Sequence, residues 1–172
     1  MANDSWRTPE DLIQTVKEFY GGTIDTDPAS SSEANDYINA TVFYDEVFNG
    51  LINIWTGNVF CNPPYSRGKV LKFLKKGMKE IELKHTDQLL LLTNLDPSTA
   101  WGRLATYKAT RMLLFGKRLS FIDPSTSKPA TDNSRCQVLY YFGKNTKRFR
   151  IFFEQYGVIT KPLRHSNDGL VM

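Results

Sequence analysis

The chain has 172 residues, of which 41% are hydrophobic and 23% charged, so it is long enough for one domain with a sizeable core. Its 22 Lys and Arg residues exceed its 18 Asp and Glu residues, and the resulting net charge of +4 fits a polyanionic partner without requiring one. Two distant cysteines without a C-x-x-C motif argue against a metal site, and the longest apolar run is too short to cross a membrane. We therefore expect a soluble, cytoplasmic protein with one domain at residues 1–160 and a tail at 161–172.

The first third of the chain predicts a helix, a short strand and a second helix. Residues 5–22 have a helical apolar stripe, with Thr8 as a candidate cap, Pro9 at the first helical position and glycines at the end. Residues 23–28, TIDTDP, alternate like a strand that ends in an acidic turn. Residues 30–44 begin with serines that can cap a helix and are partly helical in pattern.

The remaining segments alternate between strands and helices. We predict a strand at 57–62, a helix from about residue 70 to 81, a strand buried on both faces at 87–95 and a short helix at 99–109. Two strand-like segments follow at 111–122 and 135–143 around a polar loop, and a last helix and strand occupy 146–159. This alternation predicts an α/β sandwich with a mostly parallel sheet and an antiparallel edge.

The stretch NVFCNPPYSRGK, residues 58–69, places a rigid corner directly after a strand. Asn62 is held extended by Pro63, whose φ is fixed and which has no N–H. The carbonyl of Pro63 can therefore point outward beside the side-chain oxygen of Asn62, which gives two neighbouring acceptors, and Tyr65 adds an aromatic face. Sites in open α/β sheets lie at the carboxyl ends of strands. The alternative is a rigid surface turn, because Asn and Pro are common turn residues.

Two acceptors that converge on a planar amine suit N-methylation chemistry. An exocyclic amine conjugated to a ring is a poor nucleophile, because its lone pair is delocalised. Hydrogen bonds from both N–H groups to fixed acceptors favour a tetrahedral nitrogen and stabilise the charge that develops during methyl transfer. An aromatic ring stacked on the substrate holds it in line with the methyl donor. We therefore predict that the catalytic residues are Asn62, Pro63, Pro64 and Tyr65.

In these features the sequence resembles the phage-type (Dam-like) DNA N6-adenine methyltransferases. The landmarks are WRTP at 6–9, DTDPAS at 25–30, GLINIW at 50–55, FCNPPYS at 60–66, LLLLTNLDPSTAW at 89–101 and GKRLSF at 116–121. The resemblance implies a Rossmann-like methyltransferase sandwich with S-adenosylmethionine as donor. It also implies a phage-encoded enzyme, located in the host cytoplasm, that acts on a flipped-out adenine of double-stranded DNA with little or short sequence specificity. Evasion of host restriction would be the purpose by analogy.

One departure concerns the glycine-rich loop that most methyltransferases carry after their first strand, because no G-x-G occurs in this sequence. The segment TIDTDPASSSEAN resembles the acidic strand end that elsewhere binds a ribose. We predict that the donor site is lined by Asp25, Asp27, Pro28, Ala29 and Asn35, and that Trp6, Thr8 and Pro9 close over its methionine end. The alternative for the two aspartates is a role in a turn and a helix cap.

Basic residues near the corner are candidates for contacts to DNA phosphates, since a methyltransferase must extrude its target nucleotide. The predicted DNA-binding residues are Ser66, Arg67, Lys69, Arg103, Arg118 and Arg135, and the polar loop at 123–134 is a further candidate. Most other lysines are expected to be solvated helix faces. The chain has no room for a separate recognition domain, so few side chains would read the sequence.

Two other functions remain open at this point. The Asn-Pro-Pro-Tyr motif also serves methyltransferases of RNA bases and of protein glutamines, with the same chemistry on another substrate. The chain could instead be a catalytically silent phage protein that binds DNA or the donor.

Overall fold

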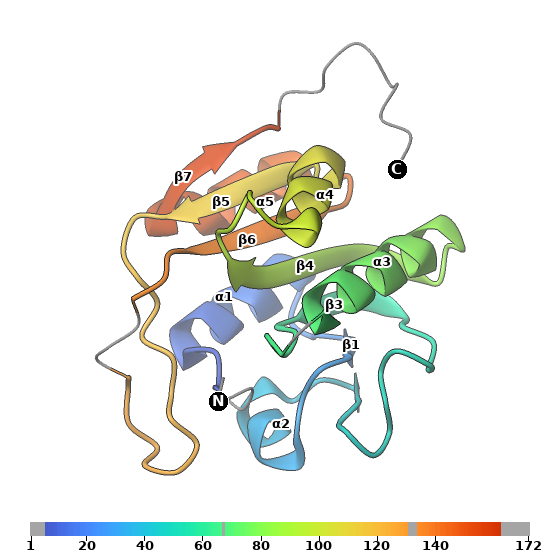
Figure 1. The fold of residues 1–172 in the computed structure, drawn as a ribbon, viewed down its shortest axis with the longest axis vertical. Helices are drawn as coiled ribbons and strands as arrows, with labels where there is room; N and C mark the ends of the chain where they lie inside the picture. The colour runs from blue at the N-terminus through green and yellow to red at the C-terminus, as the bar shows by residue number, and fades with distance from the viewer. Residues whose placement is uncertain (1–5, 67, 131–133, 163–172) are drawn as a thin grey trace.

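The computed structural model describes residues 6–66, 68–130 and 134–162, and its centre is a seven-stranded sheet (Figure 1). The strand order is β2-β1-β3-β4-β6-β5-β7. The strands are β1 (Thr26–Asp27), β2 (Val42–Phe43), β3 (Gly57–Cys61), β4 (Thr86–Asn94), β5 (Arg111–Phe115), β6 (Gln137–Phe142) and β7 (Gly157–Thr160). The first four are mutually parallel, whereas β6 is antiparallel to β4 and β5, and β7 is antiparallel to β5. The predicted parallel sheet with an antiparallel edge is therefore confirmed.

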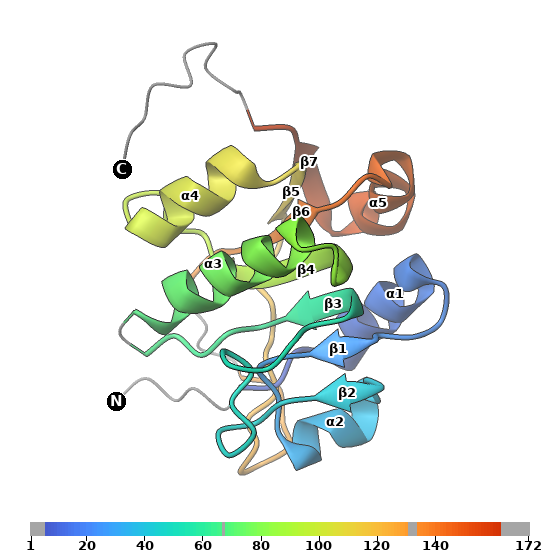
Figure 2. The ribbon, with the colours of Figure 1, turned by 90° about the vertical axis from the view of Figure 1, so that its right-hand side faces the viewer.

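Helices cover both faces of this sheet. They are α1 (Glu10–Tyr20), α2 (Ser32–Ile38), α3 (Lys69–Glu82), α4 (Ala100–Lys108) and α5 (Thr146–Phe153), with a short 3₁₀ turn at Glu154–Tyr156. One core cluster joins α1, α2 and α5 to the sheet, and a second joins α3 and α4 to its other face (Figure 2). The strand β4 serves both, because Leu90 and Leu92 lie in the first cluster while Leu89 and Leu91 lie in the second. The result is a three-layer α/β sandwich.

The local signals account for most element boundaries. Ser31 caps α2 by accepting a hydrogen bond from the Ala34 amide, and Gly21, with φ of 92°, ends α1. Thr8 is not a cap, however: α1 has Pro9 at its cap position and no side-chain cap bond, because the Thr8 hydroxyl has another partner. The strand β2 was not recognised in the sequence, since two residues are too few to show a pattern.

The order of the strands identifies one place for a ligand. From β1 the chain passes through α2 to β2 on one side, and then returns to β3 on the other side of β1. Doubly wound sheets bind ligands outside the carboxyl ends of the strands at such a reversal. The carboxyl ends of β1 and β3 therefore mark the site that the topology favours. No helix in the described ranges is long and apolar enough to cross a membrane.

Candidate functional site

The corner after β3 begins at Asn62, the first residue beyond the strand. Cys61 and Pro63 on either side are buried, and Asn62 itself is partly buried. The side-chain nitrogen of Asn62 donates to the hydroxyl oxygen of Thr8 at 3.3 Å, and Thr8 is only 2% exposed. This bond ties the segment before α1 to the carboxyl end of β3 and orients the Asn62 amide.

The side-chain oxygen, at the other end of the Asn62 amide, is the strongest sign of a ligand site. The side-chain oxygen of Asn62 is buried and has no hydrogen-bond partner among the described residues. A buried acceptor without a partner is rare in folded proteins, because its desolvation is not compensated. The arrangement fits an acceptor that is held ready for a donor group on a ligand.

Tyr65 is partly exposed, and its hydroxyl oxygen is buried. Burial raises the pKa of this hydroxyl well above its usual range, and a hydrogen bond with the Asn94 backbone at the end of β4 acts in the opposite direction. The positive charge of Arg135, just before β6, also acts to lower this pKa, so Arg135 lies near the corner. The hydroxyl of Tyr65 therefore lies near the end of β4.

The end of β1 places a buried carboxyl group beside the corner. Asp27 is 2% exposed, and its Oδ1 accepts the amide N–H of Ala29 at 3.1 Å. Burial raises the pKa of Asp27 from 3.8 to about 6, and the bonds from Ala29 and Ser30 only partly offset this. Burial raises the pKa of the Cys61 thiol, and the negative charge of Asp27 adds to that shift. The carboxyl ends of β1 and β3 are therefore electrostatic neighbours.

Two of the residues predicted for the donor site have backbone partners away from the corner. Asp25 lies before β1, and its Oδ2 accepts the amide N–H of Asn58 at 2.7 Å, near the start of β3 and not its end. The side chain of Asn35 bonds both backbone groups of Ala40 and so closes the end of α2. The structure therefore does not bring Asp25 or Asn35 to the corner, and we do not include them in the proposed site.

The other predicted donor residues lie on segments that meet at this edge. The backbone carbonyl of Thr8 accepts the hydroxyl of Tyr37, and Pro9 follows at the start of α1. Trp6 packs against the core beside α1, and Pro28 is buried directly after β1. These positions are compatible with a shared pocket wall.

Most of the predicted DNA-binding residues are on the surface at the same edge. Lys69 begins α3 and lies 4.0 Å from Glu46, and Arg103 donates from its guanidinium to the Ser98 carbonyl at 2.6 Å. Arg118 and Arg135 are exposed on the segment between β5 and β6, whereas Ser66 is partly buried. Arg67 lies outside the described residues.

Asp45 is a further candidate that the sequence reading missed. It comes two residues after β2, one strand along from β1, where doubly wound folds place the carboxylate that binds a ribose. Its Oδ1 already accepts the amide groups of Val47 and Phe48, so it also shapes the following loop. Its spacing of about 20 residues from the first strand was the available signal, but β2 was too short to reveal it.

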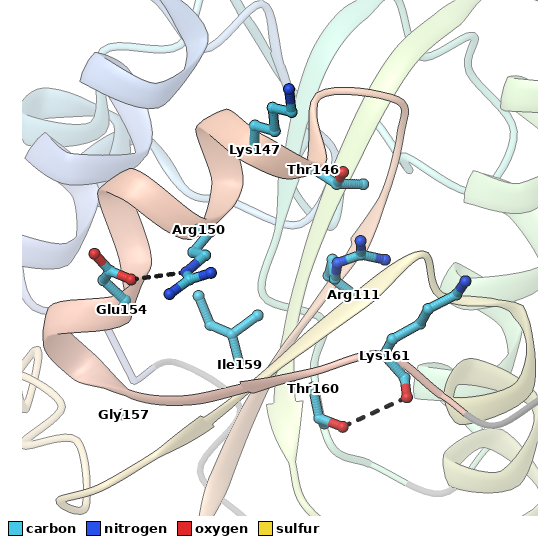
Figure 3. Close-up of a pocket in the computed structure, with 9 residues that line it drawn as sticks. All are labelled: Arg111, Thr146, Lys147, Arg150, Glu154, Gly157, Ile159, Thr160 and Lys161. Atoms are coloured by element: carbon cyan, nitrogen blue, oxygen red, sulfur yellow. Dashed lines mark hydrogen bonds and ion pairs between the residues drawn. The ribbon is translucent and has the colours of Figure 1, made fainter.

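A hollow of about 670 Å³ lies away from this edge, between α5 and β7 (Figure 3). It is lined by Arg111, Thr146, Lys147, Arg150, Glu154, Gly157, Ile159, Thr160 and Lys161. Glu154 is paired with Arg150 at 3.0 Å. None of the predicted site residues lines this hollow. Within the described ranges, no three His, Cys, Asp or Glu side chains are grouped as metal ligands would be.

Comparison with known proteins gives three similarities. Residues 1–166 match the family described as DNA N-6-adenine-methyltransferase (Dam). A DNA N-6-adenine-methyltransferase of Escherichia phage T1 is 31% identical over 154 residues, which cover 80% of this chain but only 61% of that relative. A solved structure from Pyrococcus horikoshii, provisionally described as an RNA methyltransferase, shares 14% identity with a TM-score of 0.49, and the match covers 81% of this chain and 86% of that one.

Proposed function

The chain belongs to the DNA N-6-adenine-methyltransferase (Dam) family, and we propose that it methylates the exocyclic amine of adenine in double-stranded DNA. S-adenosylmethionine is the proposed donor. The name and source of the phage T1 relative support adenine in DNA as the substrate and a phage origin for the enzyme. A phage enzyme of this kind would act in the host cytoplasm. The match spans less than two thirds of that relative, so the function is argued from the site of this chain.

The observation that carries the proposal is the unpartnered side-chain oxygen of Asn62. In the proposed reaction this oxygen accepts one N–H of the target amine, and the Pro63 carbonyl accepts the other. The amine nitrogen would bond to the methyl carbon of the donor as the carbon–sulfur bond breaks. The electrons of that bond would stay on the sulfur, and the surplus proton of the nitrogen would pass to water. Fixed acceptors favour this step because they stabilise the charge that develops on nitrogen and need no reorganisation.

The residues at the end of β1 fit a cationic donor. S-adenosylmethionine supplies a methyl group on a positively charged sulfur, and Asp27 offers a buried carboxylate whose charge is poorly compensated. We assign Asp27, Pro28 and the Ala29 segment to the donor, with Asp45 at its ribose and Trp6, Thr8 and Pro9 near its methionine end. The missing glycines are consistent with this assignment, because a short Asp-Pro-Ala turn follows β1 in their place.

The target base is assigned to the other side of the corner. The ring of Tyr65, whose hydroxyl is buried near the end of β4, would stack on the extruded adenine and keep its amine in line with the donor. Ser66, Lys69, Arg103, Arg118 and Arg135 remain candidates for contacts to phosphates, as does Arg67 from its place in the sequence.

The proposal can be tested in cells that lack adenine methylation. Expression of the protein, followed by digestion of the cellular DNA, should yield N6-methyladenine, and its sequence context gives the target. The Asn62→Ala variant is the control and should yield none. Absence of methylated adenine with the unaltered protein would contradict the proposed function.

The alternatives are separated by the substrate that becomes labelled. Labelled S-adenosylmethionine offered with DNA, RNA and protein in separate reactions should label DNA. Label in RNA or protein alone would instead support the same chemistry on that substrate. Calorimetry tests the alternative of a catalytically silent DNA-binding protein, which predicts DNA binding with no heat of donor binding.

A further inference from the structure

The loop between β2 and β3 exposes an unusual amount of apolar surface. Val47, Phe48 and Ile52 are 82%, 68% and 78% exposed, which is far more than most large apolar side chains in this protein. Contiguous exposed apolar residues on a soluble domain commonly mark an interaction site. Apart from Asp45, no residue of this loop belongs to the candidate site.

The exposure results from a fixed loop conformation. The carboxylate of Asp45 accepts the amide groups of Val47 and Phe48 at 2.8 and 2.7 Å, which forms a tight turn that leaves both side chains outside. A second turn follows, in which the Asn49 side chain accepts the Leu51 amide at 3.0 Å. The loop therefore presents its apolar tip in a preorganised form.

The loop lies against two segments of the candidate site, one at its base and one near its tip. The indole nitrogen of Trp55 donates to the Gly50 carbonyl at 2.7 Å, and a Cβ at Gly50 would lie 2.1 Å from the Pro28 carbonyl oxygen. Near the tip, Glu46 lies 4.0 Å from Lys69 at the start of α3. The loop thus extends from the end of β1 to the segment that follows the Asn62 corner, and Figure 2 shows it at that edge of the sheet.

We infer that Val47 and Phe48 form a wedge that enters the DNA base stack beside the target adenine and stabilises its extruded state. This inference rests on the proposed function. Extrusion costs unstacking and unpairing energy, and apolar side chains that insert between bases offset such costs in other DNA-binding proteins. Glu46 of the loop lies 4.0 Å from Lys69, the first residue of the helix that follows the Asn62 corner. This position next to the proposed target site favours DNA as the occupant of this surface over a lipid or an apolar protein partner.

The test compares a Val47→Ser/Phe48→Ser double variant with Ile151→Ser, which changes a side chain 70% exposed on α5. Both variants should keep the thermal stability and donor affinity of the unaltered protein. On a paired duplex that carries the mapped target, the double variant should methylate about tenfold more slowly or worse, whereas Ile151→Ser should not change. On a duplex with an abasic site opposite the target adenine, the double variant should recover most of its rate, because that adenine is no longer paired.

Three outcomes contradict parts of this account in different ways. Normal methylation of the paired duplex by the double variant would remove the loop from the reaction. An equal defect on paired and abasic duplexes would show that the loop acts on something other than extrusion. If the unaltered protein methylated neither duplex, the proposed function would fail, and the inference with it.

Discussion

The hydroxyl of Thr8 accepts a hydrogen bond from the side-chain nitrogen of Asn62 at 3.3 Å, although 54 positions separate the two residues. The bond fixes which end of the amide is the acceptor: with the nitrogen facing Thr8, the oxygen is left buried and unpartnered. The sequence predicts that Thr8 contacts the donor, and from this bond we propose that Thr8 also positions Asn62.

Replacement of Thr8 by valine should therefore impair turnover more than donor binding. Valine keeps the shape of the side chain but cannot accept the bond from Asn62, so the amide is no longer held in one orientation. We expect kcat to fall about tenfold, which corresponds to the loss of one hydrogen bond of about 1.4 kcal/mol. Thr8→Ser is the matched control and should retain most of the activity. A fall in donor affinity with unchanged kcat would place Thr8 in the donor site alone.

Removal of the Asn62 side chain should abolish most of the activity without unfolding the protein. Loss of one preorganised group in a comparable oxyanion hole costs about 2.7–4 kcal/mol, so Asn62→Ala should lower kcat about 100- to 1000-fold. Asn62→Asp should retain part of it, since a carboxylate still offers an acceptor. Single-turnover methylation measures both variants, and near-normal turnover of Asn62→Ala would refute the two-acceptor mechanism.

Asp27→Asn should stabilise the fold and weaken donor binding at the same time. Burial raises the pKa of Asp27 from 3.8 to about 6, so the folded protein favours the protonated carboxyl. Its contribution to stability is present below pH 3.8 and is lost as pH rises through about 6. At pH 8 the neutral amide should therefore raise the free energy of unfolding by about 1–3 kcal/mol, which denaturant unfolding can measure.

The same pKa predicts a pH dependence of donor affinity. A cationic donor favours the ionised form of Asp27, so the affinity of the unaltered protein for S-adenosylmethionine should weaken as pH falls below about 6. Calorimetry at several pH values should show this trend, and Asp27→Asn should remove it. A variant that is less stable and binds the donor normally would make Asp27 a purely structural residue.

Arg135→Gln should reduce the salt dependence of DNA binding. Arg135 is exposed, and its positive charge acts to lower the pKa of the Tyr65 hydroxyl. It therefore lies where it can reach a phosphate near an extruded base. Each phosphate contact contributes about 0.9 to the slope of log affinity against log salt, and that amount should disappear. Lys79→Gln, in the last turn of α3, removes one exposed charge away from the corner and is the control. Equal slopes for the two variants would exclude Arg135 from the interface.

The sequence predicted the fold well because most elements carry strong local signals. The continuous apolar run in β4 indicated a strand buried on both faces, and the apolar stripe of α3 indicated a helix with one buried face. The weaker signals were misread. Thr8 was predicted to cap α1, and β2 was missed together with Asp45 behind it. Tertiary contacts decide which partner a polar side chain bonds and whether two residues form a strand.

By itself, the sequence determined the restricted backbone of the corner, because prolines after Asn62 limit its conformation in any context. Only the tertiary structure decided which distant residues accompany it. It brought Thr8 and Asp27 to the end of β3 and bonded the side chains of Asp25 and Asn35 to backbone groups away from the corner. The physical reason is that proline geometry is local, whereas neighbours at a sheet edge depend on strand order and register, which arise from packing of the whole chain.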